Sequence, residues 1–196
     1  MSKTTIPTAG LADDAVDLTS KVTGTLPTAN GGTGATSFTA GITEIDHFRL
    51  SSGFTGDAAP IASNLERVDT SGLFEKTGTG MTESSGVFTF PSTGKYRIDF
   101  IVRQQFSGSG QYNEGTIYYT TDNSSYAIAS GSSQFISQVN STTTQAGHMN
   151  TTIFDVTNVS THKVRFHVEV QNNSTTTVGS TSETFTAMVF LRLGDT

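Results

Sequence analysis

The chain has 196 residues, enough for one domain of ordinary size and a shorter additional segment. Only 14% of the residues are charged, and the net charge of -6 argues against nucleic-acid binding, which depends on Lys and Arg contacts to phosphates. Cysteine is absent, which excludes disulfide bonds and thiolate metal sites. No apolar run is long enough for a spanning helix and Met1–Gly10 lacks the core of a secretory signal, so we expect no membrane insertion.

Small hydroxyl residues dominate the composition, with 35 Thr and 23 Ser. Thr is β-branched and favours pleated backbone, so the composition indicates an all-β chain with tight turns. Leu, Ile, Val and Phe together number only 44, which is close to the lower limit for a self-sufficient core. We therefore expect the chain to bury further apolar surface against copies of itself.

Residues 1–43 are predicted to form an N-terminal arm. No aromatic residue occurs between Met1 and Ser37, and bulky apolar residues stand singly, so this segment cannot form a core of its own. Asn30–Gly34 is a glycine-rich turn cluster. The arm is expected to become ordered only against a partner.

Residues 44–196 show the two-residue alternation of half-buried strands. It is clearest in 96–102 and 163–170, weaker in 88–90 and 153–156, and a turn at Asp122–Ser124 predicts a hairpin between 117–119 and 126–128. Eight to ten short strands are expected, which is typical of a β-sandwich or jelly roll.

The last predicted strand, 185–193, is apolar on both faces. Phe185, Ala187, Val189, Leu191 and Leu193 share one face, and Met188 and Phe190 occupy the other. A two-sheet sandwich covers one face of each strand, so another subunit is expected to cover the second. Met188 and Phe190 are predicted to lie in that subunit interface.

The segment Val22–Gly34, with the sequence VTGTLPTANGGTG, resembles a motif that recurs in bacteriophage tail-fibre and other virion proteins. The resemblance implies that the arm anchors the chain to the virion. The residues that carry this expectation are Leu26, Pro27, Asn30, Gly31, Gly32 and Gly34.

A second segment, Gly86–Phe100 with the sequence GVFTFPSTGKYRIDF, resembles the central signature of the complement C-one-q head, a tumour-necrosis-factor-like (TNF-like) jelly roll. This resemblance implies a jelly-roll knob over 44–196 that associates as a homotrimer, because members of that superfamily are normally trimers. The chain has no Gly-X-Y stalk, so the animal complement function is not implied.

No enzyme motif is present, and neither a cofactor nor a catalytic residue is expected. His148 and His167 are the histidines considered for a metal site on a threefold axis, but outward placement of His167 on its strand is the favoured interpretation. The segment 104–114 is interpreted as a surface loop, in which Phe106, Tyr112 and Asn113 are candidate receptor contacts and an ordinary connection is the equal alternative.

The sequence therefore favours a short homotrimeric fibre of a bacteriophage, made in the bacterial cytoplasm and located on the particle surface. The arm is expected to dock on other virion proteins and the knob to bind a host cell-surface glycan or protein. The alternative is a capsid decoration, cement or head-fibre protein without a receptor role.

Overall fold

The computed structural model describes residues 41–73 and 76–196, which contain thirteen strands. The predicted anchoring residues Leu26 to Gly34 lie outside the described residues. A compact unit extends from Ile42 to Thr196, and the predicted arm boundary after residue 43 stays a prediction. The strands are β1 Ile45–Leu50, β2 Phe54–Thr55, β3 Leu65–Arg67, β4 Lys76–Thr77, β5 Thr82–Ser84, β6 Val87–Thr89, β7 Gly94–Phe106, β8 Gly110–Thr120, β9 Ala127–Ile136, β10 Thr144–Val156, β11 Lys163–Val170, β12 Thr176–Thr177 and β13 Ala187–Gly194.

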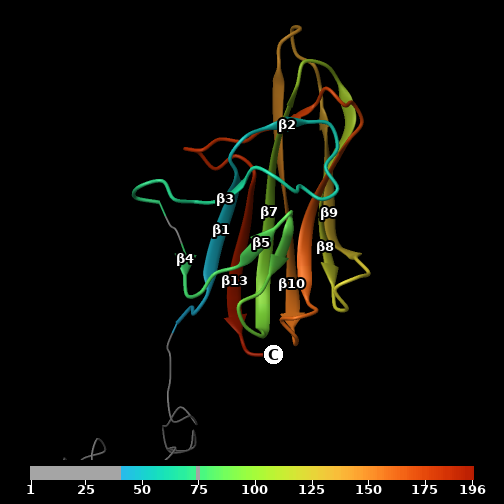
Figure 1. Cartoon of the computed structure of the whole chain (residues 1–196). Helices are drawn as coiled ribbons and strands as arrows, with labels where there is room; N and C mark the ends of the chain where they lie inside the picture. The colour runs from blue at the N-terminus through green and yellow to red at the C-terminus, as the bar shows by residue number, and fades with distance from the viewer. Residues whose placement is uncertain (1–40, 74–75) are drawn as a thin grey trace, which may run out of the picture. The chain divides into compact units, whose positions relative to one another are not determined.

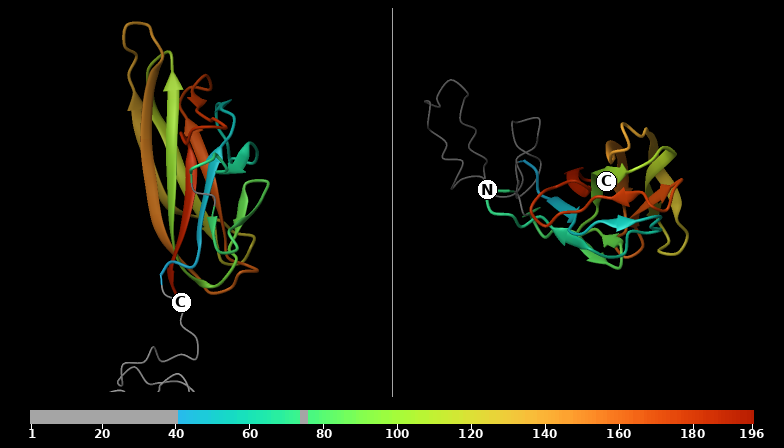
Figure 2. Two further views of the ribbon diagram at one scale, coloured as in Figure 1. Left: turned by 90° about the vertical axis from the view of Figure 1, so that its left-hand side faces the viewer. Right: turned by 90° about the horizontal axis from the view of Figure 1, so that it is seen from above.

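Two antiparallel sheets face each other, as Figures 1 and 2 show. The larger sheet has the order β2-β12-β7-β13-β1-β3, with β10 paired to β7 and β4 paired to β1. The smaller sheet has the order β5-β6-β11-β8-β9. The prediction of an all-β jelly-roll sandwich is thus confirmed.

The clearest sequence patterns predicted their strands well. The alternation of 163–170 matches β11, and Asp122 organises the predicted hairpin turn, since its Oδ1 accepts hydrogen bonds from the backbone N–H groups of Ser124 and Ser125 at 2.8 and 2.7 Å. The expectation that all strands are short is wrong for β7 and β10, which have 13 residues each. These two strands pair along their whole length and reach the end of the sandwich that lies opposite the C-terminus (Figure 1).

Aromatic rings fill the space between the sheets. Phe88 of β6 lies at the centre, with its ring centroid 5.1 Å from that of Phe48, 5.4 Å from that of Phe166 and 5.1 Å from that of Phe190. Edge-to-face and tilted contacts of this kind add stability beyond the area they bury. The small set of bulky residues is therefore concentrated in one continuous core.

Met188 and Phe190 belong to this core, and the prediction that they lie in a subunit interface is wrong. Both side chains are buried between the sheets of a single chain. On β7, Phe100 pairs with Met188 and Ile98 with Phe190, and these buried partners show that the even-numbered residues of β13 point inward. The odd-numbered residues Val189 and Leu191 therefore face outward.

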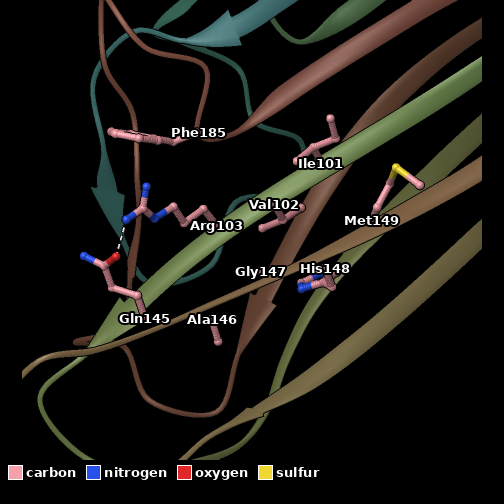
Figure 3. Close-up of a pocket in the computed structure, with 9 residues that line it drawn as sticks. All are labelled: Ile101, Val102, Arg103, Gln145, Ala146, Gly147, His148, Met149 and Phe185. Carbon is pink, nitrogen blue, oxygen red and sulfur yellow. Dashed lines mark hydrogen bonds between the residues drawn. The ribbon is translucent and has the colours of Figure 1, made fainter.

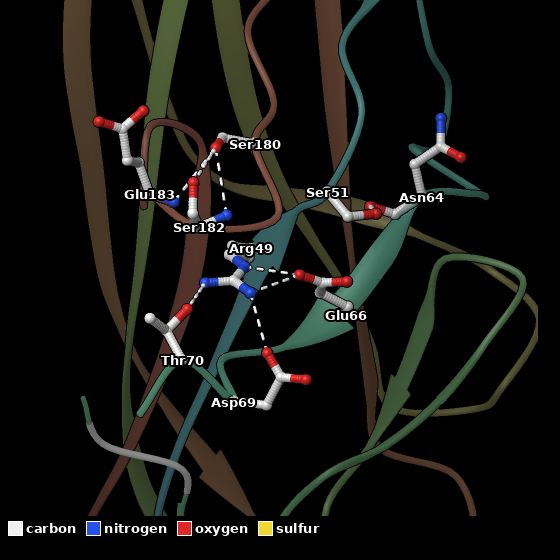
Figure 4. Close-up of polar contacts among 9 residues, drawn as sticks. All are labelled: Arg49, Ser51, Asn64, Glu66, Asp69, Thr70, Ser180, Ser182 and Glu183. Carbon is white, nitrogen blue, oxygen red and sulfur yellow. Dashed lines mark hydrogen bonds and ion pairs between the residues drawn. The ribbon is translucent and has the colours of Figure 1, made fainter. Parts of the chain in front are cut away.

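Two networks of charged side chains involve residues of β1. Arg49 points to the outer face of the larger sheet, yet only 1% of its side chain is exposed, because Glu66, Asp69 and Thr70 surround its guanidinium at 2.6–2.9 Å (Figure 4). Asp46 points inward and binds Arg67 through both of its carboxylate oxygens. Both networks connect β1 to β3, and the Arg49 network also reaches Asp69 and Thr70 in the segment that follows β3.

Candidate functional site

The outer face of the larger sheet carries an uncovered apolar strip. We define the apolar strip by five residues of β7, β10 and β13 that alternate with buried ones: Ile101, Met149, Ile153, Val189 and Leu191. Met149 is 54% exposed and Ile153 66% exposed, whereas the other three are half-buried. Such a patch on a chain with few apolar residues indicates an interaction surface.

Strand register determines the arrangement of the apolar strip. Met149 lies beside Ile101, while Arg97 separates Ile153 from Leu191. Between these two rows, Asp99 accepts hydrogen bonds from Arg97 Nε at 3.0 Å and from Thr151 Oγ1 at 2.6 Å. Arg97 and Asp99 are therefore paired with each other, which leaves the apolar side chains around them available for contact.

A hollow of about 600 Å³ adjoins the apolar strip. It lies toward the end of the larger sheet where β7 ends and the chain turns into β8. Its residues come mainly from β7 and β10: Ile101, Val102, Arg103, Gln145, Ala146, Gly147, His148, Met149 and Phe185 (Figure 3). Gly147 contributes no side chain, and this leaves space between Arg103 and Met149. The volume lies within the usual range for small-ligand sites.

Arg103 is held in place at the side of this hollow. Its guanidinium carbon lies 4.2 Å from the ring centroid of Phe185, and its Nη2 donates a hydrogen bond to Gln145 Oε1. The Nε2 of Gln145 donates in turn to Gln105 Oε1 at 3.2 Å. The arrangement presents a fixed cation beside two side-chain amides and an apolar wall.

A second apolar surface lies along β9, one of the two edge strands of the smaller sheet. Ile128 and Phe135 are exposed there, and Ile128 lines a cavity of about 350 Å³ together with Tyr119 and with Ile153 of β10. The exposed edge thus adjoins the apolar strip around β10. The chain presents two different apolar surfaces on adjacent sides of the sandwich.

The predicted receptor loop is mostly strand. β7 continues to Phe106 and β8 begins at Gly110, so the connection is a tight turn rather than a long loop. Tyr112 is 41% exposed and fits the prediction of an accessible side chain, and Phe106 is half-buried. Asn113 is fully buried and donates to the carbonyl oxygen of Gln134 at 3.3 Å, so its prediction as a receptor contact is wrong.

The structure separates the two histidines that were considered for a metal site. His148 points between the sheets toward Gly115, whereas His167 lies on the outer face of β11 and stacks on Tyr118 with ring centroids 4.0 Å apart. In residues 41–73 and 76–196, no group of three or more His, Asp or Glu side chains could hold a metal ion. The same residues include no helix with the length and apolar character needed to cross a membrane.

Burial lowers the pKa of three histidines. The pKa of His167 falls to about 4 because of burial and the nearby charge of Arg165. Burial also lowers the pKa of His148, and burial with the charge of Arg49 lowers that of His47. None of these rings is therefore expected to be protonated in the folded chain at neutral pH.

The folded chain should consequently lose stability in mild acid. The unfolded chain takes up a proton at His167 near pH 6.5, whereas the folded chain excludes it until about pH 4, so the free energy of unfolding decreases as the pH falls through this interval. Urea denaturation at pH 7 and pH 5 measures the difference, which should become smaller in His167→Gln. A wild-type chain that is equally stable at both pH values would contradict this linkage.

Comparison with solved structures identifies the fold. The chain is similar to the structure of Eiger TNF from S. frugiperda, with a TM-score of 0.57 and 10% sequence identity, covering 78% of this chain and 93% of that one. It is also similar to murine APRIL, determined at pH 5.0 and at pH 8.5, with a TM-score of 0.51 in both cases. Sequence identity to the two APRIL structures is 10% and 11%, and each match covers 76% of this chain and 98% of that one.

These likenesses define the chain as a protein with a TNF-like jelly-roll fold. No protein-family model matches the sequence, and no curated protein matches it either. At 10–11% identity the similarity concerns the fold and not the activity. The function must therefore be argued from the surfaces of this chain.

Proposed function

We propose that this chain is a bacteriophage virion protein, a short homotrimeric fibre whose N-terminal arm docks on the particle and whose jelly-roll head binds the host cell surface. The observation that carries the proposal is the apolar strip next to the exposed β9 edge. The resemblance of Val22–Gly34 to virion fibre motifs supports the location on the particle.

The two apolar surfaces suit a heterologous contact, in which the edge of one copy packs on the outer face of the next. Ile128 and Phe135 are the exposed bulky apolar side chains of this edge strand, and the apolar strip is the surface that receives them. Contacts between two different patches form a closed ring when the rotation between copies allows it. Three copies agree with the trimers of the superfamily that Gly86–Phe100 resembles, and a trimer would multiply weak attachment contacts.

Ile153→Lys is expected to dissociate the trimer without unfolding the chain. Ile153 is mostly exposed in the single chain, and a lysine at this position faces Arg97 on β7, so it introduces an unpaired charge into the proposed contact. A loss of about 2 kcal/mol or more per interface is expected, which is typical of a central contact residue. Sedimentation velocity measures the shift from trimer to monomer.

Leu73→Lys is the matched control, because Leu73 is an exposed apolar residue outside the apolar strip and the β9 edge. It should sediment like the wild-type chain. A wild-type chain that sediments as a monomer, or an Ile153→Lys variant that remains a trimer, would reject the proposed contact.

Immunogold labelling of intact particles with antibody against residues 44–196 tests the proposed attachment role. Gold confined to the tail is the expected result. Gold spread over the capsid would instead support decoration of the head, and attachment to the host would then be rejected. Particles without gold would reject the virion location itself.

A further inference from the structure

The inner faces of the two sheets change from apolar to polar along the sandwich. Tyr96, Ile98 and Phe100 of β7 belong to the core in the half nearer the C-terminus, whereas the half toward the turn between β7 and β8 carries buried polar side chains. We define the polar interior by six residues of that half: Gln104, Asn113, His148, Asn150, Thr175 and Thr177. Five of them are no more than 2% exposed, and His148 points between the sheets.

Strand register places the polar interior between the two sheets. On the larger sheet, Gln104 of β7 pairs with Thr177 of β12, and Asn150 lies on β10, the other neighbour of β7. On the smaller sheet, Asn113 of β8 stands two residues before Gly115, so both positions face the larger sheet. The Nδ2 group of Asn150 donates to the carbonyl oxygen of Gly115 at 2.6 Å, which joins β10 to β8 across the interior.

Most polar atoms of the polar interior have no hydrogen-bond partner among the described residues. Eight of the fourteen buried side-chain nitrogen and oxygen atoms without such a partner belong to these six residues. They are both amide atoms of Gln104, both ring nitrogens of His148, the Oδ1 atoms of Asn113 and Asn150, and the hydroxyl oxygens of Thr175 and Thr177. A buried polar group without a partner costs free energy, and eight would offset much of what a domain gains by folding. A ligand that supplies these hydrogen bonds is therefore expected.

The chemistry of the polar interior restricts the ligand. The unpartnered atoms include both donors and acceptors, and the six residues contain no carboxylate, ammonium or guanidinium group that would attract an ion. Short side chains such as Ser132 and Ala146 stand beside the polar ones on the inner faces, and sheets that stack about 10 Å apart leave room next to them for a molecule of the size of water. A small neutral ligand that both donates and accepts hydrogen bonds meets these conditions.

We propose that the polar interior binds ordered water molecules, which connect the two sheets through the unpartnered side-chain atoms. A buried water molecule makes about three hydrogen bonds, so a few of them satisfy all eight atoms. The polar interior shares no residue with the apolar strip and includes neither Ile128 nor Phe135, so the proposed contact between copies does not cover it. The inference is therefore the same for a single chain and for a trimer, and it does not depend on the proposed function.

Thr177→Val replaces a fully buried hydroxyl group by a methyl group of the same size. If water binds this hydroxyl, the variant loses a hydrogen bond, and its folding equilibrium constant should fall about fivefold in urea denaturation. If the hydroxyl is unpaired and dry, the variant should be more stable, because a costly buried group is removed. Thr176→Val is the matched control, since Thr176 is its half-buried neighbour on β12 outside the polar interior. Greater or unchanged stability of Thr177→Val, or an equal loss in both variants, would overturn the proposal.

Magnetic relaxation dispersion of water ¹⁷O detects the bound molecules directly, because water held inside a protein exchanges much more slowly than surface water. The full-length chain should show such a dispersion, and its amplitude should fall in Gln104→Met, which removes both amide atoms from the interior. Gln105→Met makes the same change on the outer face of β7 and should leave the amplitude unchanged. Absence of a dispersion in the wild-type chain, or equal amplitudes in the wild type and Gln104→Met, would overturn the proposal.

Discussion

Phe190→Ala is expected to lower the free energy of unfolding by about 3–5 kcal/mol, because it truncates a fully buried aromatic side chain of the core. The ring of Phe190 contacts three other aromatic rings, with centroids 5.1 Å from Phe88, 6.0 Å from Phe166 and 6.4 Å from Phe90. Removing it leaves a cavity at a position where both sheets meet. Chemical denaturation monitored by circular dichroism measures the loss.

Val189→Ala is the matched control on the same strand, because its side chain points outward. It should cost less than about 1 kcal/mol when single chains are compared. A Phe190→Ala variant that retains wild-type stability and only dissociates would show that the side chain lies between subunits, contrary to its place in the core.

Asp46→Ala is expected to destabilise the chain by about 3 kcal/mol. Only 2% of Asp46 is exposed, and its carboxylate accepts hydrogen bonds from Arg67 Nε at 2.8 Å, from Arg67 Nη2 at 2.9 Å and from the backbone N–H of Met81 at 2.6 Å. The substitution leaves the Met81 N–H buried without a partner and the Arg67 charge uncompensated.

Two further variants define the cause of this effect. Asp46→Asn keeps the size and one acceptor oxygen but removes the charge, so its stability should lie between those of the wild type and Asp46→Ala. Asp195→Ala removes the exposed partner of Arg192 and should change the free energy of unfolding by less than about 0.5 kcal/mol. If Asp46→Ala and Asp195→Ala were equally stable, the buried Asp46 carboxylate would contribute no more to the free energy of unfolding than the exposed Asp195 carboxylate does.

Sequence patterns predicted the strands where polar and apolar residues alternate strictly, as in β11. They could not decide the orientation of β13, because both of its faces are apolar. Which face of β13 points into the core depends on its pairing with Ile98 and Phe100 of β7, which lie about ninety residues away in the chain. The same patterns missed the first half of β10, where Thr, Gln and Gly give no apolar alternation.

The hollow beside Arg103 could not be predicted from the sequence for a related reason. Arg103, Gln145 and Phe185 come from distant segments, and the sheet pairing brings them together. The segment 104–114 appeared to be a loop because it is rich in Gly, Ser and Gln, although its backbone forms strand ladders. The composition of this segment therefore did not predict its geometry.

The position of β13 between β1 and β7 has a consequence for how the protein is made. The ribosome releases β13 last of the thirteen described strands, so β1 and β7 emerge without the neighbour that joins them. Until residue 194 is synthesised, their unpaired backbone groups and apolar side chains remain open to other nascent chains. Slow translation or early termination within residues 187–194 should therefore favour aggregates over folded subunits.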